Sequence, residues 1–284
     1  MTVINFTKMH GIGNDYVYIN DTESIIKNPN ELSKKISDRH FGIGSDGLIL
    51  IRNSDIADFK MSMFNADGSE AQMCGNGIRC VAKYVYDNKL TNKKSLKIET
   101  LAGIKTLELN VQDGEVFEVT VDMGEPILEP RKIPVNSNLK EFINQEIKVN
   151  DTNYFATCVS MGNPHTIIFV KDVDKFRVCE IGKEIENNKE LFPQKTNVEF
   201  IEVLDAHNLR MRVWERGSGE TLACGTGACA SLVAGHLNNL CKSQAFVYLK
   251  GGILNIKWDK KTNHVFLTGG ATKVFDGNFT INEE

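Results

Sequence analysis

Two cysteines in this 284-residue chain occupy the same kind of local setting, each directly before a Gly-x-Gly triplet. Cys74 is followed by Gly-Asn-Gly and Cys224 by Gly-Thr-Gly, and a polar loop precedes each of them. Both triplets open segments with helical periodicity, so each thiol is predicted at the N-terminus of a helix. The unpaired N–H groups and partial positive charge of such a terminus can hold an anion and make a thiolate available.

Two thiols placed this way have an evident chemical use. If one carboxylate lay between both helix ends, the carbon bearing it would have a thiol on each side. One thiolate could remove a proton from that carbon while the other thiol returned a proton from the opposite face, which inverts a stereocentre. Backbone N–H groups would stabilise the enolate that forms between the two steps.

Other uses of the cysteines fit the spacing less well. Structural zinc sites usually contain Cys-x₂₋₄-Cys pairs, whereas five residues separate Cys74 from Cys80 and the four between Cys224 and Cys229 cross a helix start. A nucleophilic cysteine would need a histidine base, and His165 is the best placed of the six. The remaining cysteines are expected to be buried hydrophobes, namely Cys80, Cys158, Cys179, Cys229 and Cys241.

Composition narrows the class of protein. Hydrophobic residues make up 41% and charged residues 25% of the chain, as in ordinary globular domains. The net charge of −4 offers no basic surplus for nucleic-acid binding. No apolar run approaches the ~18 residues of a membrane span. The odd number of cysteines, seven, and the absence of a secretory signal over residues 1–20 favour a cytoplasmic protein with reduced thiols.

Hydrophobic periodicity predicts the elements that must position the two cysteines. We expect helices over residues 30–38, 77–88 and 226–240. We expect strands over 3–6, 16–19, 48–51, 59–65, 96–99, 106–111, 116–121, 155–160, 166–170, 197–204, 208–214, 246–249, 253–258, 265–269 and about 272–281.

The order of these elements repeats along the chain. Cys74 and Cys224 are 224 − 74 = 150 residues apart, and at the same offset Gly77 matches Gly227. At an offset of 149, Asn14 matches Asn163. Two copies of one unit indicate a duplication. The prediction is therefore an α+β fold with two pseudo-symmetric domains, each a curved, mainly antiparallel sheet around a central helix. Residues 1–122, joined by the last strand at about 271–284, would form one half and residues 123–270 the other, with the active site in the cleft between them.

Both cysteine motifs resemble those of a known family. The first reads Asn65-Ala-Asp-Gly-Ser-Glu-Ala-Gln-Met-Cys-Gly-Asn-Gly-Ile-Arg79, and the second reads Glu215-Arg-Gly-Ser-Gly-Glu-Thr-Leu-Ala-Cys-Gly-Thr-Gly-Ala228. They resemble the two half-site signatures of the diaminopimelate epimerases, and the similarity runs from His10 to Gly277. The resemblance implies an enzyme of lysine and peptidoglycan-precursor biosynthesis that interconverts LL-2,6-diaminopimelate and its meso form. It also implies a homodimer with no pyridoxal phosphate, metal or other cofactor.

The resemblance further implies a role for each site residue. In the LL-to-meso direction Cys224 would take the proton and Cys74 would donate one. Backbone N–H groups would bind the reacting carboxylate, and polar side chains would hold the rest of the substrate. His165 and Glu215 would modulate the pKa values of the thiols. The planar guanidinium of Arg216, with its fork of N–H donors, suits the distal carboxylate of the substrate. The expected substrate-binding residues are Asn14, Asn65, Gly75, Asn76, Asn163, Asn197, Glu215, Arg216, Gly225 and Thr226.

Alternatives remain open at this point. Asn14 and Asn163 could be turn residues, Asn65 a strand-end cap, and Glu215-Arg216 a solvated charge pair. Some relatives carry Gln at the position of Gly47, and the glycine of this chain has no side chain to make the same contact. The chain could also be a racemase for another amino acid such as proline, or a duplicated ligand-binding protein without catalysis.

Overall fold

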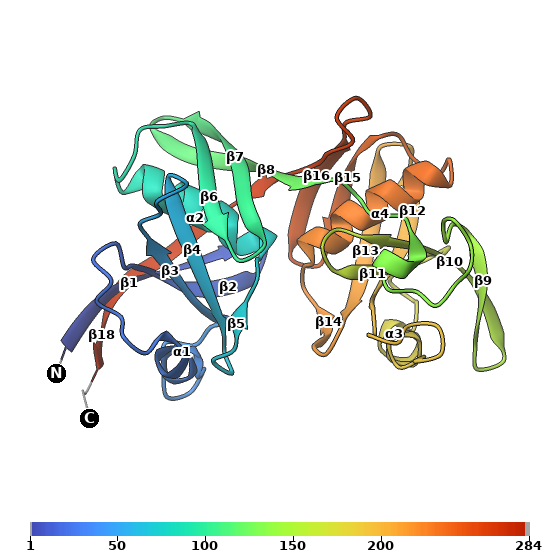
Figure 1. Cartoon of the computed structure of the whole chain (residues 1–284), viewed down its shortest axis with the longest axis horizontal. Coiled ribbons are helices and arrows are strands. Elements are labelled where there is room, and N and C mark those ends of the chain that lie inside the picture. The colour runs from blue at the N-terminus through green and yellow to red at the C-terminus, as the bar shows by residue number, and fades with distance from the viewer. Residues whose placement is uncertain (1, 282–284) are drawn as a thin grey trace. The chain divides into compact units, whose positions relative to one another are not determined.

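The computed structural model describes residues 2–281 and divides into two compact units. Unit 1 contains Met1–Val121 and Gly269–Glu284, and unit 2 contains Asp122–Thr268. The chain leaves unit 1 within strand β8 (Glu115–Gly124) and returns to it within β17 (Val265–Gly270) (Figure 1). Each unit combines a large sheet with helices, which confirms the α+β class.

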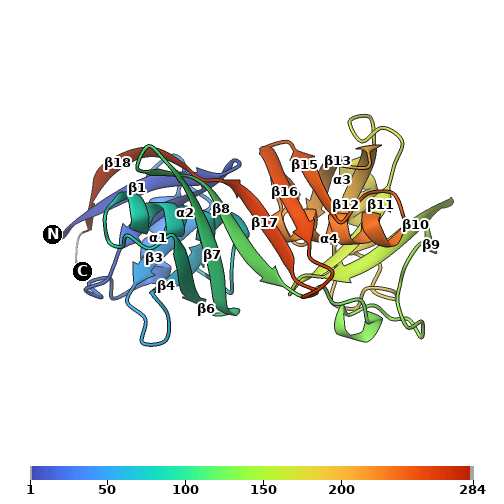
Figure 2. The ribbon, with the colours of Figure 1, turned by 90° about the horizontal axis from the view of Figure 1, so that it is seen from above.

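Unit 1 is built from a mixed sheet in which antiparallel pairs are interrupted by two parallel pairs, β2–β3 and β4–β6. Antiparallel pairing joins β18 to β1 and runs on through β2, and Figure 2 shows β18 alongside β1. Its strands are β1 (Thr2–Gly11), β2 (Asn14–Asn20), β3 (Gly47–Arg52), β4 (Phe59–Asn65), β5 (Glu70–Ala71), β6 (Ser95–Thr100), β7 (Gly103–Gln112), β8 and β18 (Thr272–Ile281).

Two helices cover the central strands of unit 1 on opposite faces. Helix α1 (Pro29–Ser37) packs Leu32 and Ile36 against every second residue of β2 and β3, including Val17 and Leu48. Helix α2 (Gly75–Asp87) occupies the other face, where Tyr18 Oη donates to the carbonyl of Gly77 at 3.4 Å. Because helices cover β3 on both faces, residues 48–51 are fully buried. A strand buried on both faces has a continuous run of apolar residues.

Unit 2 repeats this arrangement element by element. Parallel pairs β11–β12 and β13–β15 stand where unit 1 has β2–β3 and β4–β6. Helix α3 (Val178–Glu186) follows β11 as α1 follows β2, and α4 (Gly225–Leu237) precedes β15 as α2 precedes β6. The duplication predicted from the 150-residue offset is therefore confirmed. The strands are β9 (Gln145–Val149), β10 (Thr152–Ser160), β11 (Pro164–Phe169), β12 (Asn197–Asp205), β13 (Asn208–Glu215), β14 (Gly219–Thr221), β15 (Gln244–Leu249), β16 (Gly252–Trp258) and β17, with a short 3₁₀ turn η1 (Pro130–Lys132).

The predicted helices differ from the observed ones mainly at their ends. Helix α4 stops at Leu237 instead of residue 240 because Asn238 caps it and Asn239 takes a left-handed φ of 59°. Helix α2 ends at Asp87 in the same way, with a φ of 60° at Lys89. Both helices start at the first glycine of their triplet, earlier than predicted.

Helix α3 and strand β9 were not predicted at all. Helix α3 is short and has no side-chain cap, so only Val178, Ile181 and Ile185 on its buried face carry a helical signal. The prediction for Cys179 was wrong, because its side chain is exposed on this helix and donates to Glu220 Oε2 at 3.3 Å. The other four cysteines predicted as core residues are buried. Among residues 2–281, no helix has the length and apolar character that crossing a membrane requires.

Candidate active site

Cys74 is the N-cap residue of α2, as the Gly-x-Gly spacing predicts. Its backbone is extended, with φ −134° and ψ 118°, and its Sγ accepts a hydrogen bond from the Gly77 N–H at 3.4 Å. The thiol donates to Asn14 Oδ1 at 3.2 Å. Asn14 Nδ2 donates in turn to Asp46 Oδ2 at 2.7 Å. Because a carboxylate only accepts hydrogen bonds, this contact fixes the Asn14 amide with its oxygen toward the thiol.

The buried side chain of Arg79 supports the N-terminus of helix α2. Its side chain is completely buried and its guanidinium donates to three oxygens. These are the Gly75 carbonyl at 2.9 Å, Asn76 Oδ1 at 3.1 Å and the Gly270 carbonyl at 3.2 Å. Arg79 therefore holds in place the two residues, Gly75 and Asn76, whose backbone N–H groups are the expected carboxylate ligands.

Asn65 and Gly47 lie next to each other at the paired ends of β4 and β3. Asn65 Nδ2 donates to Ser69 Oγ at 3.0 Å, within the loop that leads toward Cys74. A Cβ added at Gly47 would lie 2.1 Å from the carbonyl oxygen of Phe64. A side chain at residue 47 cannot be accommodated here unless β4 moves.

Cys224 is the N-cap residue of α4 and is more deeply buried, with 5% of its surface exposed. Its Sγ lies 3.6 Å from Thr226 Oγ1, and either atom can donate. Burial raises the pKa of the Cys224 thiol well above its usual range, and the nearby carboxylates of Glu215 and Glu199 raise it further. Burial also raises the pKa of Glu215, which accepts a short hydrogen bond from Thr221 Oγ1.

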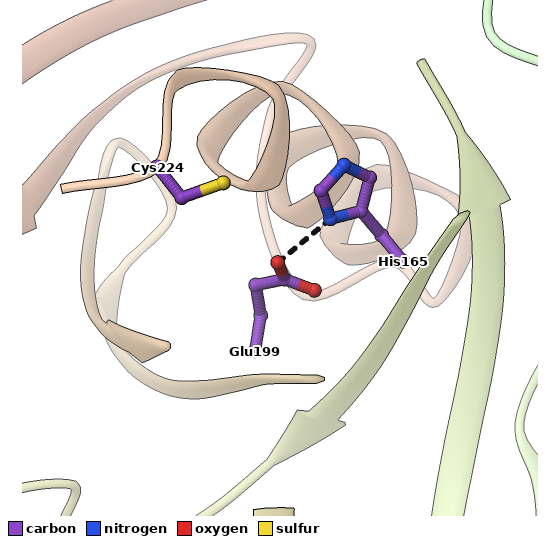
Figure 3. A group of neighbouring side chains, drawn as sticks. All are labelled: His165, Glu199 and Cys224. Atoms are coloured by element: carbon purple, nitrogen blue, oxygen red, sulfur yellow. Dashed lines mark hydrogen bonds and ion pairs between the residues drawn. The ribbon is translucent and has the colours of Figure 1, made fainter. Parts of the chain in front are cut away.

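His165 lies fully buried on β11 beside Cys224 (Figure 3). One ring nitrogen, Nδ1, is 2.7 Å from Glu199 Oε1, and the other, Nε2, is 3.0 Å from Asn163 Oδ1. Asn163 Nδ2 is 3.3 Å from Thr226 Oγ1. A continuous set of contacts thus leads from Glu199 through His165, Asn163 and Thr226 to the thiol.

Glu199 is the site residue that sequence reasoning missed. The buried Val198 and Phe200 of β12 face α3, and Glu199 lies on the opposite face of the strand. Helix α4 covers that opposite face, and Glu199 is completely buried. The repeat could have revealed this, because 199 − 150 = 49 and Ile49 belongs to a continuous apolar run.

The loop after β13 places Glu215 and Arg216. Asn197 is buried, and its side chain bridges the Pro164 carbonyl at 2.8 Å and the Arg216 N–H at 2.9 Å. The Arg216 guanidinium reaches the surface, where Nη1 donates to the Gln194 carbonyl at 3.1 Å. Asn197 thus positions the backbone of Arg216. Besides the N–H group that bonds to Gln194, the Arg216 guanidinium has further N–H donors that could bind a ligand.

One donor set in unit 2 has the chemistry of a metal ligand group. A ring nitrogen of His165, a carboxylate oxygen of Glu199 and Cys224 Sγ all lie within 4.8 Å of one another. Nitrogen, oxygen and sulfur ligands of these types are those that zinc prefers. These residues are far apart in sequence, so the cysteine spacing could not have indicated them.

The described contacts group the predicted residues into two half-sites. The first is Cys74 with Asn14, Asn76 and Gly75, and the second is Cys224 with Asn163, His165, Thr226 and Glu215. Each half-site presents a thiol at a helix N-terminus. The chemistry open to each thiol is proton exchange at a carbon next to a carboxylate.

The fold of this chain is shared with several solved structures. A phenazine biosynthesis protein from Bacillus anthracis matches with a TM-score of 0.70 and 18% identity, over 99% of this chain and 100% of that one. A hydroxyproline epimerase from Agrobacterium vitis matches with a TM-score of 0.70 and 13% identity, over 98% of this chain and 91% of that one. These two likenesses show the fold of the chain.

Sequence comparison identifies the family of the chain. The sequence model described as diaminopimelate epimerase matches residues 6–129 and 157–274. Diaminopimelate epimerases from Acetivibrio thermocellus and Methanococcus maripaludis (strain C5) are each 58% identical to this chain. The matches cover 99% and 98% of this chain respectively, and 100% of each relative. The chain belongs to the diaminopimelate epimerase family.

Proposed function

We propose that this chain interconverts LL-2,6-diaminopimelate and meso-diaminopimelate, with Cys74 and Cys224 as its two acid–base groups. The observation that carries the proposal is the matching position of the two thiols, each at the N-cap of the corresponding helix in its own unit. Membership of the family supports the choice of substrate.

The proposed reaction uses one thiol from each half-site at a single α-carbon. The N–H groups of Gly75-Asn76 and Gly225-Thr226 hold the reacting carboxylate and stabilise the enolate. In the LL-to-meso direction the Cys224 thiolate removes the α-proton and the Cys74 thiol supplies one from the opposite face. The roles reverse in the other direction. A thiol and a thiolate must therefore coexist in the resting enzyme, and after each turnover they have exchanged.

The remaining polar residues recognise the part of the substrate that does not react. Asn14, Asn65, Asn163 and Asn197 line up the amino and carboxyl groups, and Glu215 with Arg216 receives the distal end. Lysine biosynthesis, with supply of a peptidoglycan precursor, is the pathway this reaction serves. We place the enzyme in the cytoplasm as a homodimer, in keeping with its reduced thiols and with its family resemblance.

The direct test separates the two stereoisomers by chromatography after incubating purified protein with LL-diaminopimelate. The proposal expects a mixture of LL and meso forms from either starting isomer, with proline and hydroxyproline unchanged. Racemisation of proline with diaminopimelate left unchanged would assign the chain to another substrate. No change in any of these amino acids would favour the non-catalytic alternative.

Replacing Arg216 tests the distal carboxylate contact. We expect Arg216→Met to lower kcat/KM for diaminopimelate about 100-fold, because a charge-assisted bidentate contact contributes roughly 1.5–3 kcal/mol. Most of the change should appear in KM, since this end of the substrate does not react. The assay is steady-state epimerisation, with Arg210→Met on the exposed side of β13 as the control. An unchanged KM in Arg216→Met would rule out this role.

A further inference from the structure

The turn that carries Arg216 (residues 216–218, between β13 and β14) is held by the segment that leads from α3 into β12. Arg216 and Gly217 are exposed. The Gly217 N–H nevertheless donates to the buried carboxylate of Glu186, the last residue of α3, at 3.0 Å. The Arg216 N–H donates to Asn197, and its guanidinium donates to the Gln194 carbonyl. Three residues of one segment therefore bind two consecutive residues of the turn.

The carboxylate of Glu186 is the centre of a buried set of hydrogen bonds, and 4% of the residue's surface is exposed. Its Oε1 accepts from the Gly217 N–H and from Lys195 Nζ, both at 3.0 Å. Its Oε2 accepts from Trp214 Nε1 at 2.7 Å. Burial alone would raise the pKa of Glu186, but the hydrogen bonds from these donors hold it below its usual value. The carboxylate is therefore ionised at neutral pH and accepts hydrogen bonds on both oxygens.

The position of Glu186 follows from the packing of α3 against β13 and β14 (Figure 1). A Cβ added at Gly182 would lie 2.5 Å from Trp214 Cβ, so the glycine lets the helix backbone approach this strand closely. Glu186 is four residues further along the same helix face, where it accepts from the indole N–H. A Cβ at Gly219, just after the turn, would lie 3.6 Å from two indole atoms. Trp214 thus lies between α3 and the end of the turn.

Unit 1 links the corresponding turn to its own helix by different chemistry. The turn after β4 corresponds to the turn after β13, and α1 corresponds to α3. Asn30 Nδ2 on α1 donates to the Gly68 carbonyl, and Ser33 Oγ donates to the Asn65 carbonyl, both at 2.8 Å. Neutral side chains thus make the link in unit 1, and a carboxylate makes it in unit 2. What the two copies have in common is the fixed position of the turn.

Glu215, the residue before Arg216, is held independently of Glu186. Its side chain accepts a hydrogen bond from Thr221 on β14. Its backbone belongs to the last residue pair between β13 and β14. Arg216 lies beyond this pair, where the contact with Glu186 fixes the following residue of the turn. Loss of the Glu186 carboxylate should therefore affect Arg216 and leave Glu215 in place.

We propose that Glu186 is a positioning residue for substrate recognition, which holds the 216–218 turn in the conformation from which Arg216 binds the distal carboxylate. Holding the turn before the substrate arrives removes the cost of ordering an exposed segment during binding. Glu186 contacts no reacting atom, so its contribution is to substrate affinity. This inference rests on the proposed function, because that function assigns Arg216 to the distal end of the substrate.

Steady-state epimerisation by Glu186→Met tests this proposal. Methionine is similar to glutamate in length but has no oxygen to accept from Gly217. We expect KM for diaminopimelate to rise about tenfold and kcat to stay within about twofold, because the turn must now be ordered as the substrate binds. Glu186→Gln keeps one oxygen and should raise KM by a smaller factor. Glu184→Met, at an exposed position of α3, is the control and should leave both constants unchanged.

The split between KM and kcat separates positioning from a purely structural role. Partial unfolding lowers the number of active molecules and hence the apparent kcat, but it leaves the KM of the folded molecules unchanged. Combination with Arg216→Met shows whether Glu186 acts through that arginine. In Arg216→Met the distal contact is already lost, so the addition of Glu186→Met should raise KM no further.

Amide hydrogen exchange of the substrate-free protein measures the state of the turn itself. The peptide that contains residues 215–219 should exchange about tenfold faster in Glu186→Met, because the Gly217 N–H has lost its acceptor. The peptide that contains residues 65–69 of unit 1 is the internal reference and should exchange as in the intact protein. Circular dichroism shows whether Glu186→Met is folded, and if it is not, Glu186→Gln carries the same measurements.

Three kinetic results would overturn the inference: an unchanged KM in Glu186→Met, a loss confined to kcat, or an equal rise in KM with and without Arg216→Met. Unchanged amide exchange over residues 215–219 would overturn it as well. If the intact protein does not epimerise diaminopimelate, the proposed function falls, whereas the exchange rates still decide whether Glu186 holds the turn.

Discussion

Cys74→Ala and Cys224→Ala each lower epimerisation about a thousandfold or more, in both directions. Positioned acid–base groups contribute typically 10²–10⁴-fold, and neither face of the α-carbon has a second thiol to replace the lost one. Because LL-to-meso and meso-to-LL turnover use the same two groups in opposite roles, both directions should fall together. Chromatographic separation of the isomers measures the effect.

Cys179→Ala is the matched control for these variants. Cys179 is exposed on α3 and lies outside both half-sites. Its removal should leave turnover and the free energy of unfolding within error of the intact protein. Full turnover by either Cys74→Ala or Cys224→Ala would refute the two-thiol mechanism.

Arg79→Met should have the largest effect on stability, lowering the free energy of unfolding by about 3 kcal/mol. Methionine fills much of the volume but leaves two backbone carbonyls and the Asn76 side-chain oxygen without the donor that Arg79 provides. Each buried polar group left unsatisfied costs roughly 1–3 kcal/mol. Activity should fall as well, since Gly75 and Asn76 lose their support.

Urea unfolding followed by tryptophan fluorescence and circular dichroism measures this loss. Arg210→Met is the comparison, because Arg210 is partly exposed and its ion pair with Asp174 lies at the surface. Such a pair contributes at most about 1 kcal/mol. Equal unfolding midpoints for Arg79→Met and Arg210→Met would show that Arg79 does not organise the α2 start.

Local sequence patterns predicted most of the helices and strands. The two Gly-x-Gly triplets placed both cysteines at helix starts because glycine spacing and the apolar stripe of the following segment are local features. Helix α3 escaped detection because its nine residues lack a side-chain cap and carry few apolar positions. Cys179, on the same helix, was assigned to the core together with the four other cysteines outside the working pair.

The half-site around Cys224 could be predicted only in part. His165 and Glu215 were predicted as thiol-tuning residues from the resemblance to the diaminopimelate epimerases. Glu199 was not found, because its burial depends on α4 covering one face of β12, and strand alternation alone does not say which face is covered. Its contact with His165 depends on parallel strand register, which is a property of the folded sheet.

Hydrogen exchange at the reacting carbon tests the central claim most directly. LL-diaminopimelate is incubated with the purified protein in heavy water. At low conversion the isomers are separated, and the mass of each is measured by mass spectrometry. If one thiol removes the proton and the other returns one, the meso product carries one solvent deuterium at the inverted carbon, while recovered LL substrate keeps its hydrogen. A meso product that retains the original hydrogen would contradict the account, as would the complete absence of exchange and product.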